Sequence, residues 1–232
     1  MAVAHGSRDP RAAATVAALL DQVPLDVRVA YLDHCAPTLG RALHGLEEAV
    51  VLPLLLTEAY HSRVDLPAAL HEVRAREPRL RVHHGTTLGP HPLLRVALER
   101  RLAEAGVPAG DPDTAVVLVS AGSSDARANA VVAAMARTWR RAGWWAVEAA
   151  YASAAEPSPA RAVAELVRAG APRVAVAPYL LAPGYFADKV RRTTLEAGAA
   201  AVAEVLGPAP ELVDVLLERY AAAQLGPVSL AG

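Results

Sequence analysis

The stretch Ala4-His5-Gly6-Ser7-Arg8-Asp9 decides the fold, because it recurs in the second half of the chain as Ser120-Ala121-Gly122-Ser123-Ser124-Asp125. Both copies follow a short apolar run. Further pairs recur in the same order: Tyr31–Pro37 with Tyr151–Pro157, Pro53–Leu56 with Pro178–Leu181, and Leu88–Pro92 with Leu206–Pro210. A repeat of about 110–120 residues is too long for a solenoid unit. The sequence therefore predicts two copies of one module.

Each module alternates short β-branched runs with longer amphipathic stretches. In the first module we expect strands at Ala2–Ala4, Val27–Tyr31, Ala49–Leu55 and Leu80–His83, and helices at Arg11–Gln22, Leu39–Glu48, Asp65–Arg76 and Pro92–Ala105. In the second we expect strands near Ala115–Val119, Trp145–Ala150, Arg173–Pro178 and Ala201–Val205, each followed by a helix. This order predicts an α/β fold of two similar lobes, each a small parallel sheet flanked by helices. The Gly- and Pro-containing linker Gly106–Asp113 divides the chain into expected domains 1–110 and 111–232.

Composition excludes several classes of protein. The chain has 232 residues, of which 53% are hydrophobic and 20% charged, so it has too much apolar sequence for a disordered protein. Its net charge of −1 gives no basic platform for nucleic acid. Its longest apolar runs contain proline and are too short to cross a bilayer. No secretory signal is recognisable, and the lone Cys35 fits a reducing compartment, so we expect a cytoplasmic protein.

All eight histidines lie in the first module, at positions 5, 34, 44, 61, 71, 83, 84 and 91. In the repeat, His5 corresponds to Ala121, His61 to Phe186 and His91 to Ala209. The second copy therefore builds equivalent loops without imidazole, and the fold alone does not require these histidines.

Ligands of open parallel sheets bind beyond the carboxyl ends of the strands. That rule selects His5 after the first strand, Asp33 and His34 after the second, Glu58 and His61 after the third, and His84 and His91 after the fourth. An imidazole pair from His5 and His61 with the Asp33 carboxylate suits Fe²⁺, Co²⁺, Ni²⁺ or Zn²⁺. Each residue also has a structural reading: His5 in a turn, His61 exposed on a loop, and Asp33 capping a helix or turn.

The other candidates are weaker. We expect His34, His44 and His71 at surface or packing positions, His83, His84 and His91 finishing strands and turns, and Cys35 as a small, at least half-buried residue. Around the favoured histidines, Ser7, Arg8, Arg11 and Arg63 are candidate contacts for an anionic substrate. The GxxxxGK[ST], GxGxxG and GxSxG motifs are missing, so ATP use is not expected.

These motifs resemble the ATP-independent class II tetrapyrrole chelatases, and within them the sirohydrochlorin chelatases of sirohaem and cobalamin biosynthesis. The resemblance rests on Ala4–Arg8, on Tyr31-Leu32-Asp33 with Pro37, and on Pro53–Pro67. It implies that His5 and His61 bind the metal or take protons from the macrocycle and that Asp33, standing where that family usually has glutamate, assists. It also implies a tetrapyrrole in the cleft between the lobes. The segment Pro183–Phe186 of the second lobe, with Tyr185, is the candidate wall against the ring, and the alternative is that it only packs between the lobes.

The expected activity is insertion of Fe²⁺ or Co²⁺ into sirohydrochlorin, with the metal (Fe²⁺, Co²⁺ or Ni²⁺) as substrate and no permanent cofactor. Partners beyond substrate and metal are not expected, and the chain is expected to be a monomer or weak homo-oligomer. Two alternatives stay open: a non-catalytic tetrapyrrole or metal carrier, and a histidine-type phosphatase. The phosphatase reading is weakened because Ala4 stands where such enzymes have an arginine that clamps phosphate.

Overall fold

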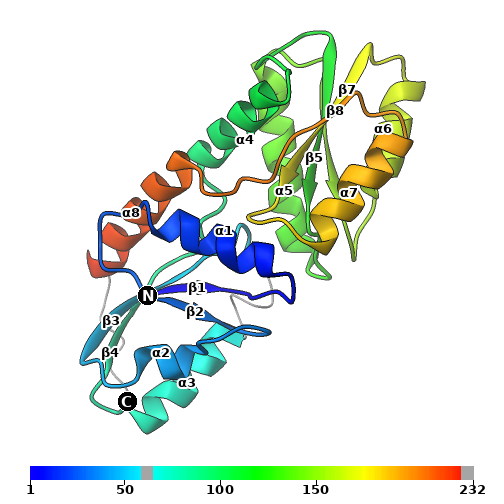
Figure 1. The fold of residues 1–232 in the computed structure, drawn as a ribbon. Coiled ribbons are helices and arrows are strands. Elements are labelled where there is room, and N and C mark those ends of the chain that lie inside the picture. The colour runs from blue at the N-terminus through cyan, green and yellow to red at the C-terminus, as the bar shows by residue number, and fades with distance from the viewer. Residues whose placement is uncertain (59–64, 226–232) are drawn as a thin grey trace. The chain divides into compact units, whose positions relative to one another are not determined.

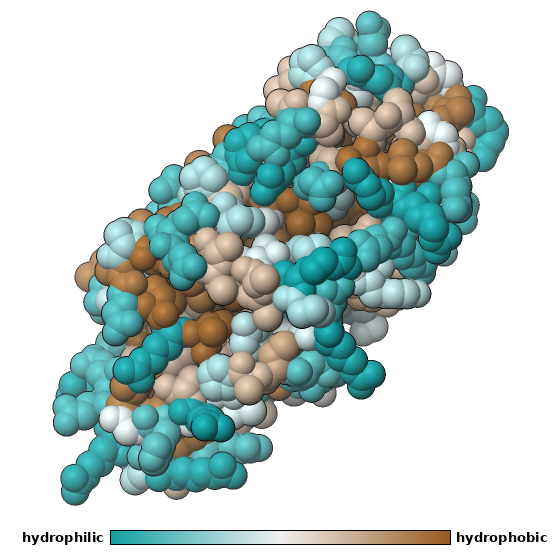
Figure 2. Space-filling view, viewed as in Figure 1, coloured by the Kyte–Doolittle hydropathy of each residue, from teal (hydrophilic) through white to brown (hydrophobic). Residues whose placement is uncertain are grey.

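The computed structural model describes residues 1–58 and 65–225. It contains two four-stranded parallel sheets flanked by helices (Figure 1), which confirms the predicted fold class. No helix in the described ranges is long and apolar enough to cross a membrane. On the face seen in Figure 2, hydrophilic side chains cover much of the surface and smaller hydrophobic patches interrupt them. The chain divides into an N-terminal unit, Met1–His91 with Pro208–Gly232, and a central unit, Pro92–Gly207.

The N-terminal unit has strand order β2-β1-β3-β4. Helices α1 and α8 lie on one face of its sheet, and α2 and α3 lie on the other (Figure 1). Its elements are β1 (Ala2–Ala4), α1 (Pro10–Leu20), β2 (Val29–Tyr31), α2 (Leu39–Leu43), β3 (Glu48–Pro53), α3 (Leu66–Arg76), β4 (Arg81–His84) and α8 (Pro210–Leu225). Its core includes Val3, Leu43 and Val82, all buried.

The central unit repeats this plan with strand order β6-β5-β7-β8. Its elements are α4 (Pro92–Glu104), β5 (Thr114–Ser120), α5 (Ala126–Trp139), a 3₁₀ turn η2 (Arg140–Ala142), β6 (Ala146–Tyr151), α6 (Pro159–Arg168), β7 (Arg173–Tyr179), α7 (Tyr185–Glu196) and β8 (Ala201–Val202). Every residue of β5 is buried, because strands flank it on both edges and helices cover both faces.

The units do not follow the expected domains 1–110 and 111–232. Helix α4 comes from the first half of the chain but packs on β7 of the central unit, and α8 comes from the second half but packs on β3 and β4. The repeated modules thus exchange their last helices. An amphipathic pattern shows that a helix has a buried face, but it does not show which sheet that face covers.

Several element boundaries also differ from the sequence expectation, among them the following two. The helix expected at Leu39–Glu48 ends at Leu43, because Gly45 takes a positive φ of 74° and Glu48 begins β3. The strand expected from Val27 begins at Val29, beside the first residue of β1.

In each sheet, the loop after the first strand contains a glycine that closely contacts the loop after the second strand. Gly6 has φ +96°, and a Cβ built on it would lie 1.8 Å from the carbonyl oxygen of Asp33. Gly122 repeats this with φ +84° and 1.9 Å to the carbonyl oxygen of Ser153. Only glycine permits such an approach of two backbones. The loop after the first strand is thereby held against the loop after the second.

We predict that Gly122→Ala destabilises the protein by at least about 2 kcal/mol more than Gly170→Ala. Gly170 is a matched control because its φ is +88° and a Cβ there meets nothing within 4 Å. Both variants incur the left-handed backbone penalty of about 1–2 kcal/mol, but only Gly122→Ala forces two backbones apart. Urea unfolding followed by circular dichroism measures the difference. Equal losses in the two variants would show that the close approach imposes no constraint.

Candidate functional site

The site begins where β1 and β2 end. His5 follows β1 and is half-buried, with its Nδ1 3.1 Å from the carbonyl oxygen of Gly6. The backbone N–H of Asp33 donates to the carbonyl oxygen of His5 at 2.9 Å. The Asp33 side chain is 62% exposed, and its Oδ1 accepts from the N–H of His34 at 2.7 Å. The structure therefore brings the predicted His5 and Asp33 to one edge of the sheet.

His34 is exposed, as expected, and its side chain lies beside those of Asp33 and His5. Its Nε2 lies 3.4 Å from Oδ2 of Asp33, and its ring centroid lies 6.4 Å from that of His5. Its φ of 60° is unusual for a residue other than glycine. The equivalent Ala154 has φ 58°, so the backbone is kept in both units while the imidazole is present in one. That substitution within the repeat is the signal that could have identified His34.

His5 and Asp33 line a large open cavity of about 1180 Å³. The other residues that line this cavity belong to the segment after β2 and to α3. The charged residues among them include Arg41, Arg76 and Glu72. Neither arginine stood out in the sequence, because arginines are frequent in all of its helices. The cavity extends from His5 and Asp33 along α3, and imidazole, carboxylate and guanidinium groups line it.

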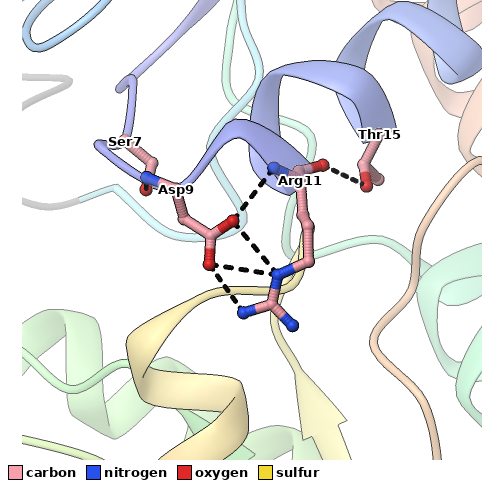
Figure 3. A network of polar contacts seen from close by, with 4 residues as sticks. All are labelled: Ser7, Asp9, Arg11 and Thr15. Atoms are coloured by element: carbon pink, nitrogen blue, oxygen red, sulfur yellow. Dashed lines mark hydrogen bonds and ion pairs between the residues drawn. The ribbon is translucent and has the colours of Figure 1, made fainter.

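The loop after His5 is fixed by its own polar contacts (Figure 3). Ser7 Oγ accepts the backbone N–H of Asp9 at 3.0 Å, and Ser123 repeats this contact with Asp125 at 3.0 Å. Since the unit without histidines keeps the same contact, Ser7 has a turn-forming role here. Its predicted contact with substrate remains a prediction.

Arg11 is also engaged within the loop. Its guanidinium binds both carboxylate oxygens of Asp9, with Nη2 2.6 Å from Oδ2. Asp9 also accepts the backbone N–H of Arg11 as the N-cap of α1. Donation from Arg11 lowers the pKa of Asp9. Arg11 would have to leave this ion pair to bind a substrate, whereas the neighbouring Arg8 is exposed.

Three further predicted residues stay untested by this geometry. His61 and Arg63 lie outside the described residues. Tyr185 begins α7 of the central unit, and its side chain is 73% exposed with its ring 5.7 Å from that of Phe186. An exposed aromatic pair is suited to stacking on a flat ring.

Several remaining histidines have carboxylate partners. His44 lies 2.6 Å from Glu77, His83 lies 2.8 Å from Glu48, and His91 lies 2.9 Å from Glu218. Hydrogen bonds from His83 and Arg81 lower the pKa of Glu48. Burial lowers the pKa of His84.

Cys35 is half-buried as expected, and its Sγ donates to the carbonyl oxygen of Ser7 at 3.1 Å.

Within residues 1–58 and 65–225, no three His, Cys, Asp or Glu side chains converge closely enough to hold a metal ion. The described part of the site therefore provides His5, His34 and Asp33 at an open edge rather than a closed cage.

Comparison with known proteins identifies a family and several relatives that are named as chelatases. The CbiX family model matches residues 1–105 and 115–223. A sirohydrochlorin cobaltochelatase of Priestia megaterium is 29% identical over 195 residues, which cover 78% of this chain and 63% of the relative. The chain thus spans less than two thirds of that relative's length. A sirohydrochlorin ferrochelatase of the same organism is 28% identical over 200 residues, or 82% of this chain and 75% of the relative.

Solved structures show the same fold. SirB from Bacillus subtilis with Fe³⁺ superimposes with a TM-score of 0.79 at 24% identity, covering 97% of this chain and 94% of SirB. The structure of CbiX, the terminal enzyme for biosynthesis of siroheme in denitrifying bacteria, gives a TM-score of 0.70 at 23% identity, covering 96% and 97%. Because the family model matches both modules almost completely, the chain belongs to the CbiX family.

Proposed function

We propose that this protein inserts a divalent metal, Fe²⁺ or Co²⁺, into sirohydrochlorin without ATP. One observation carries the proposal: the two units share strand order and loop geometry, yet only the N-terminal unit places imidazoles and a carboxylate at the carboxyl ends of its strands. The relatives named for cobalt and iron insertion support the same reading.

Metal insertion needs bases and exchangeable ligands in one place. Two pyrrole protons must leave the macrocycle, and the water molecules bound to the metal must be replaced. Imidazole serves both needs, since it is a base near neutral pH and a ligand for borderline divalent ions. His5 and His61 are proposed as metal ligands and proton acceptors, with His34 beside His5 and the Asp33 carboxylate supporting the cation. The metal is a substrate here, and no permanent cofactor is required.

The cavity beside His5 also suits the substrate. Sirohydrochlorin is a polycarboxylate, and Arg41 and Arg76 on the cavity wall supply cations without a basic surface overall. We propose that Arg8, which is exposed, and Arg63, two residues after His61, also contact carboxylates of the substrate. Tyr185 is proposed as an aromatic contact to the macrocycle. Binding the periphery of the macrocycle provides energy that can strain the ring toward the puckered shape needed for insertion.

The proposal also covers the choice of metal, the location of the protein and its oligomeric state. Fe²⁺ and Co²⁺ are favoured over Ni²⁺ because the chelatase relatives are named for iron and cobalt. We propose a cytoplasmic protein that acts as a monomer or weak homo-oligomer and has no nucleic-acid partner.

A carrier on the same scaffold is the main alternative. A carrier would bind sirohydrochlorin or Co²⁺ but would not accelerate the spectral change that accompanies insertion. A phosphatase would instead form a phospho-histidine at His5, which acid-labile labelling detects. Accelerated insertion without such an intermediate distinguishes the proposed chelatase from both.

We predict that His5→Ala lowers the rate of Co²⁺ insertion into sirohydrochlorin by at least about 100-fold, because a base and ligand is lost. The melting temperature should stay unchanged, since Ala121 occupies the same loop position in the central unit. His71→Ala, on the exposed face of α3, is the matched control and should insert cobalt normally. Normal turnover by His5→Ala would refute the site assignment.

We predict that His34→Ala slows insertion by about 10–100-fold and weakens Co²⁺ binding measured without tetrapyrrole. The fold should tolerate this change, because Ala154 holds the same left-handed conformation with φ 58°. Stopped-flow absorbance gives the rate, and calorimetric titration gives the affinity. An unchanged rate and affinity would show that His34 takes no part in metal binding or insertion.

We expect Asp33→Ala to slow insertion less than His5→Ala does. The carboxylate is 62% exposed and its Oδ1 already accepts a backbone N–H, so its reach toward a metal is limited. The same stopped-flow assay compares the two variants. A loss equal to or larger than that of His5→Ala would make Asp33 a principal ligand.

A further inference from the structure

The first turn of α7 presents two aromatic rings to solvent. Tyr185 and Phe186 begin this helix after the loop that follows β7, so they lie at the carboxyl edge of the central sheet, where ligands of parallel sheets bind. Tyr185 is the most exposed large hydrophobic side chain of the central unit, and Phe186 is 38% exposed. Exposed rings add little to the stability of the unit, because apolar surface stabilises a fold when it is buried.

Lys189 lies one helical turn after Tyr185 and is also exposed. Residues four apart on a helix are neighbours on its surface, so the ammonium group extends from the same face as the Tyr185 ring. The residue type is unusual for this chain, because Lys189 is its single lysine beside 22 arginines. The first two turns of α7 thus combine exposed aromatic rings with one lysine ammonium.

This ammonium differs from the other cations of α7 in having no carboxylate partner. Arg191 pairs with Glu204 at 3.4 Å, and Arg192 pairs with Glu196 at 3.6 Å. In the described part of the chain, no carboxylate lies within ion-pair distance of Lys189. Its charge is therefore available to an anion from outside the helix.

The repeat shows that the fold does not require a cation at this position. Helices α3 and α7 each follow the third strand of their module. Aligning them by the buried residues that each carries four positions apart pairs Leu66 and Leu70 with Val190 and Thr194. Lys189 then stands where the N-terminal unit has Asp65, which lines the cavity beside His5. The unit with the imidazoles carries a carboxylate here, which suits a cation, and the central unit carries an ammonium, which suits an anion.

We propose that Lys189 is a specificity-determining residue for the anionic tetrapyrrole, and that its ammonium binds a carboxylate at the rim of a macrocycle that contacts Tyr185. This inference rests on the proposed function, in which the substrate is the polycarboxylate sirohydrochlorin. The ring of Tyr185 offers a flat apolar surface to the macrocycle, and Lys189, one turn away, offers a charge to a carboxylate side chain beside it.

Lysine suits this contact better than the paired arginines of the same helix. An ammonium on a flexible stem can follow a carboxylate that is itself on a flexible side chain, whereas a guanidinium binds best in one planar, bidentate arrangement. The contact is exposed, so we expect a moderate gain in affinity for the tetrapyrrole rather than an effect on the chemistry of insertion.

The test compares Lys189→Gln with Arg192→Gln, a matched control that removes an exposed and paired cation from the same helix. We expect Lys189→Gln to raise the Kd for metal-free sirohydrochlorin, measured by absorbance titration, and the KM for insertion by about 5–10-fold, because one charge-assisted contact is lost. The kcat, the Co²⁺ affinity and the melting temperature should stay unchanged. Arg192→Gln should change the Kd by less than about twofold, and Lys189→Arg should keep it within about threefold of the wild type.

Salt provides a second readout. The ratio of the two Kd values, Lys189→Gln over wild type, should fall toward one between about 0.05 and 0.5 M salt, because salt screens an exposed ion pair. An unchanged Kd in Lys189→Gln, or an equal rise in Arg192→Gln, overturns the proposal. The titration needs no metal insertion. A wild-type protein that binds sirohydrochlorin without accelerating insertion would therefore contradict the proposed chelatase activity, while the Kd comparison would still decide the role of Lys189.

Discussion

The structure depends on a backbone contact that only glycine permits. Gly6 approaches the carbonyl of Asp33 so closely that a methyl group cannot be accommodated, and the N–H of Asp33 donates to His5 at 2.9 Å. These contacts hold the loops after β1 and β2 together. The imidazole of His5 and the side chains of Asp33 and His34 are consequently placed at one edge of the sheet before any ligand binds.

The duplicated module gives this arrangement an internal control. Gly122 repeats the contact with Ser153, and Ser123 repeats the turn made by Ser7. Ala121 and Ala154 stand where the N-terminal unit has His5 and His34. Residues kept in both copies therefore build the scaffold, and residues present in one copy are candidates for chemistry. On this basis Ser7 and Asp9 belong to the scaffold, whereas His34 joins the site.

The sequence predicted the features that depend on local pattern. Alternating strands and helices, the duplication and the positions of His5 and Asp33 all follow from periodicity and motif spacing. It could not predict the exchange of α4 and α8, because amphipathicity does not identify the sheet that a helix covers. It placed His34 at the surface, where the structure has it, but it could not show that this ring lies 6.4 Å from that of His5.

The central claim is that the imidazoles at the end of β1 and β2 handle a divalent cation, while the same edge of the central unit does not. Anomalous diffraction at the cobalt edge, from crystals grown with Co²⁺, locates the ion directly. The account predicts a peak within about 2–2.5 Å of a ring nitrogen of His5, with no peak at the loop of Ala121. A peak remote from His5, or one of equal height in the central unit, would contradict it.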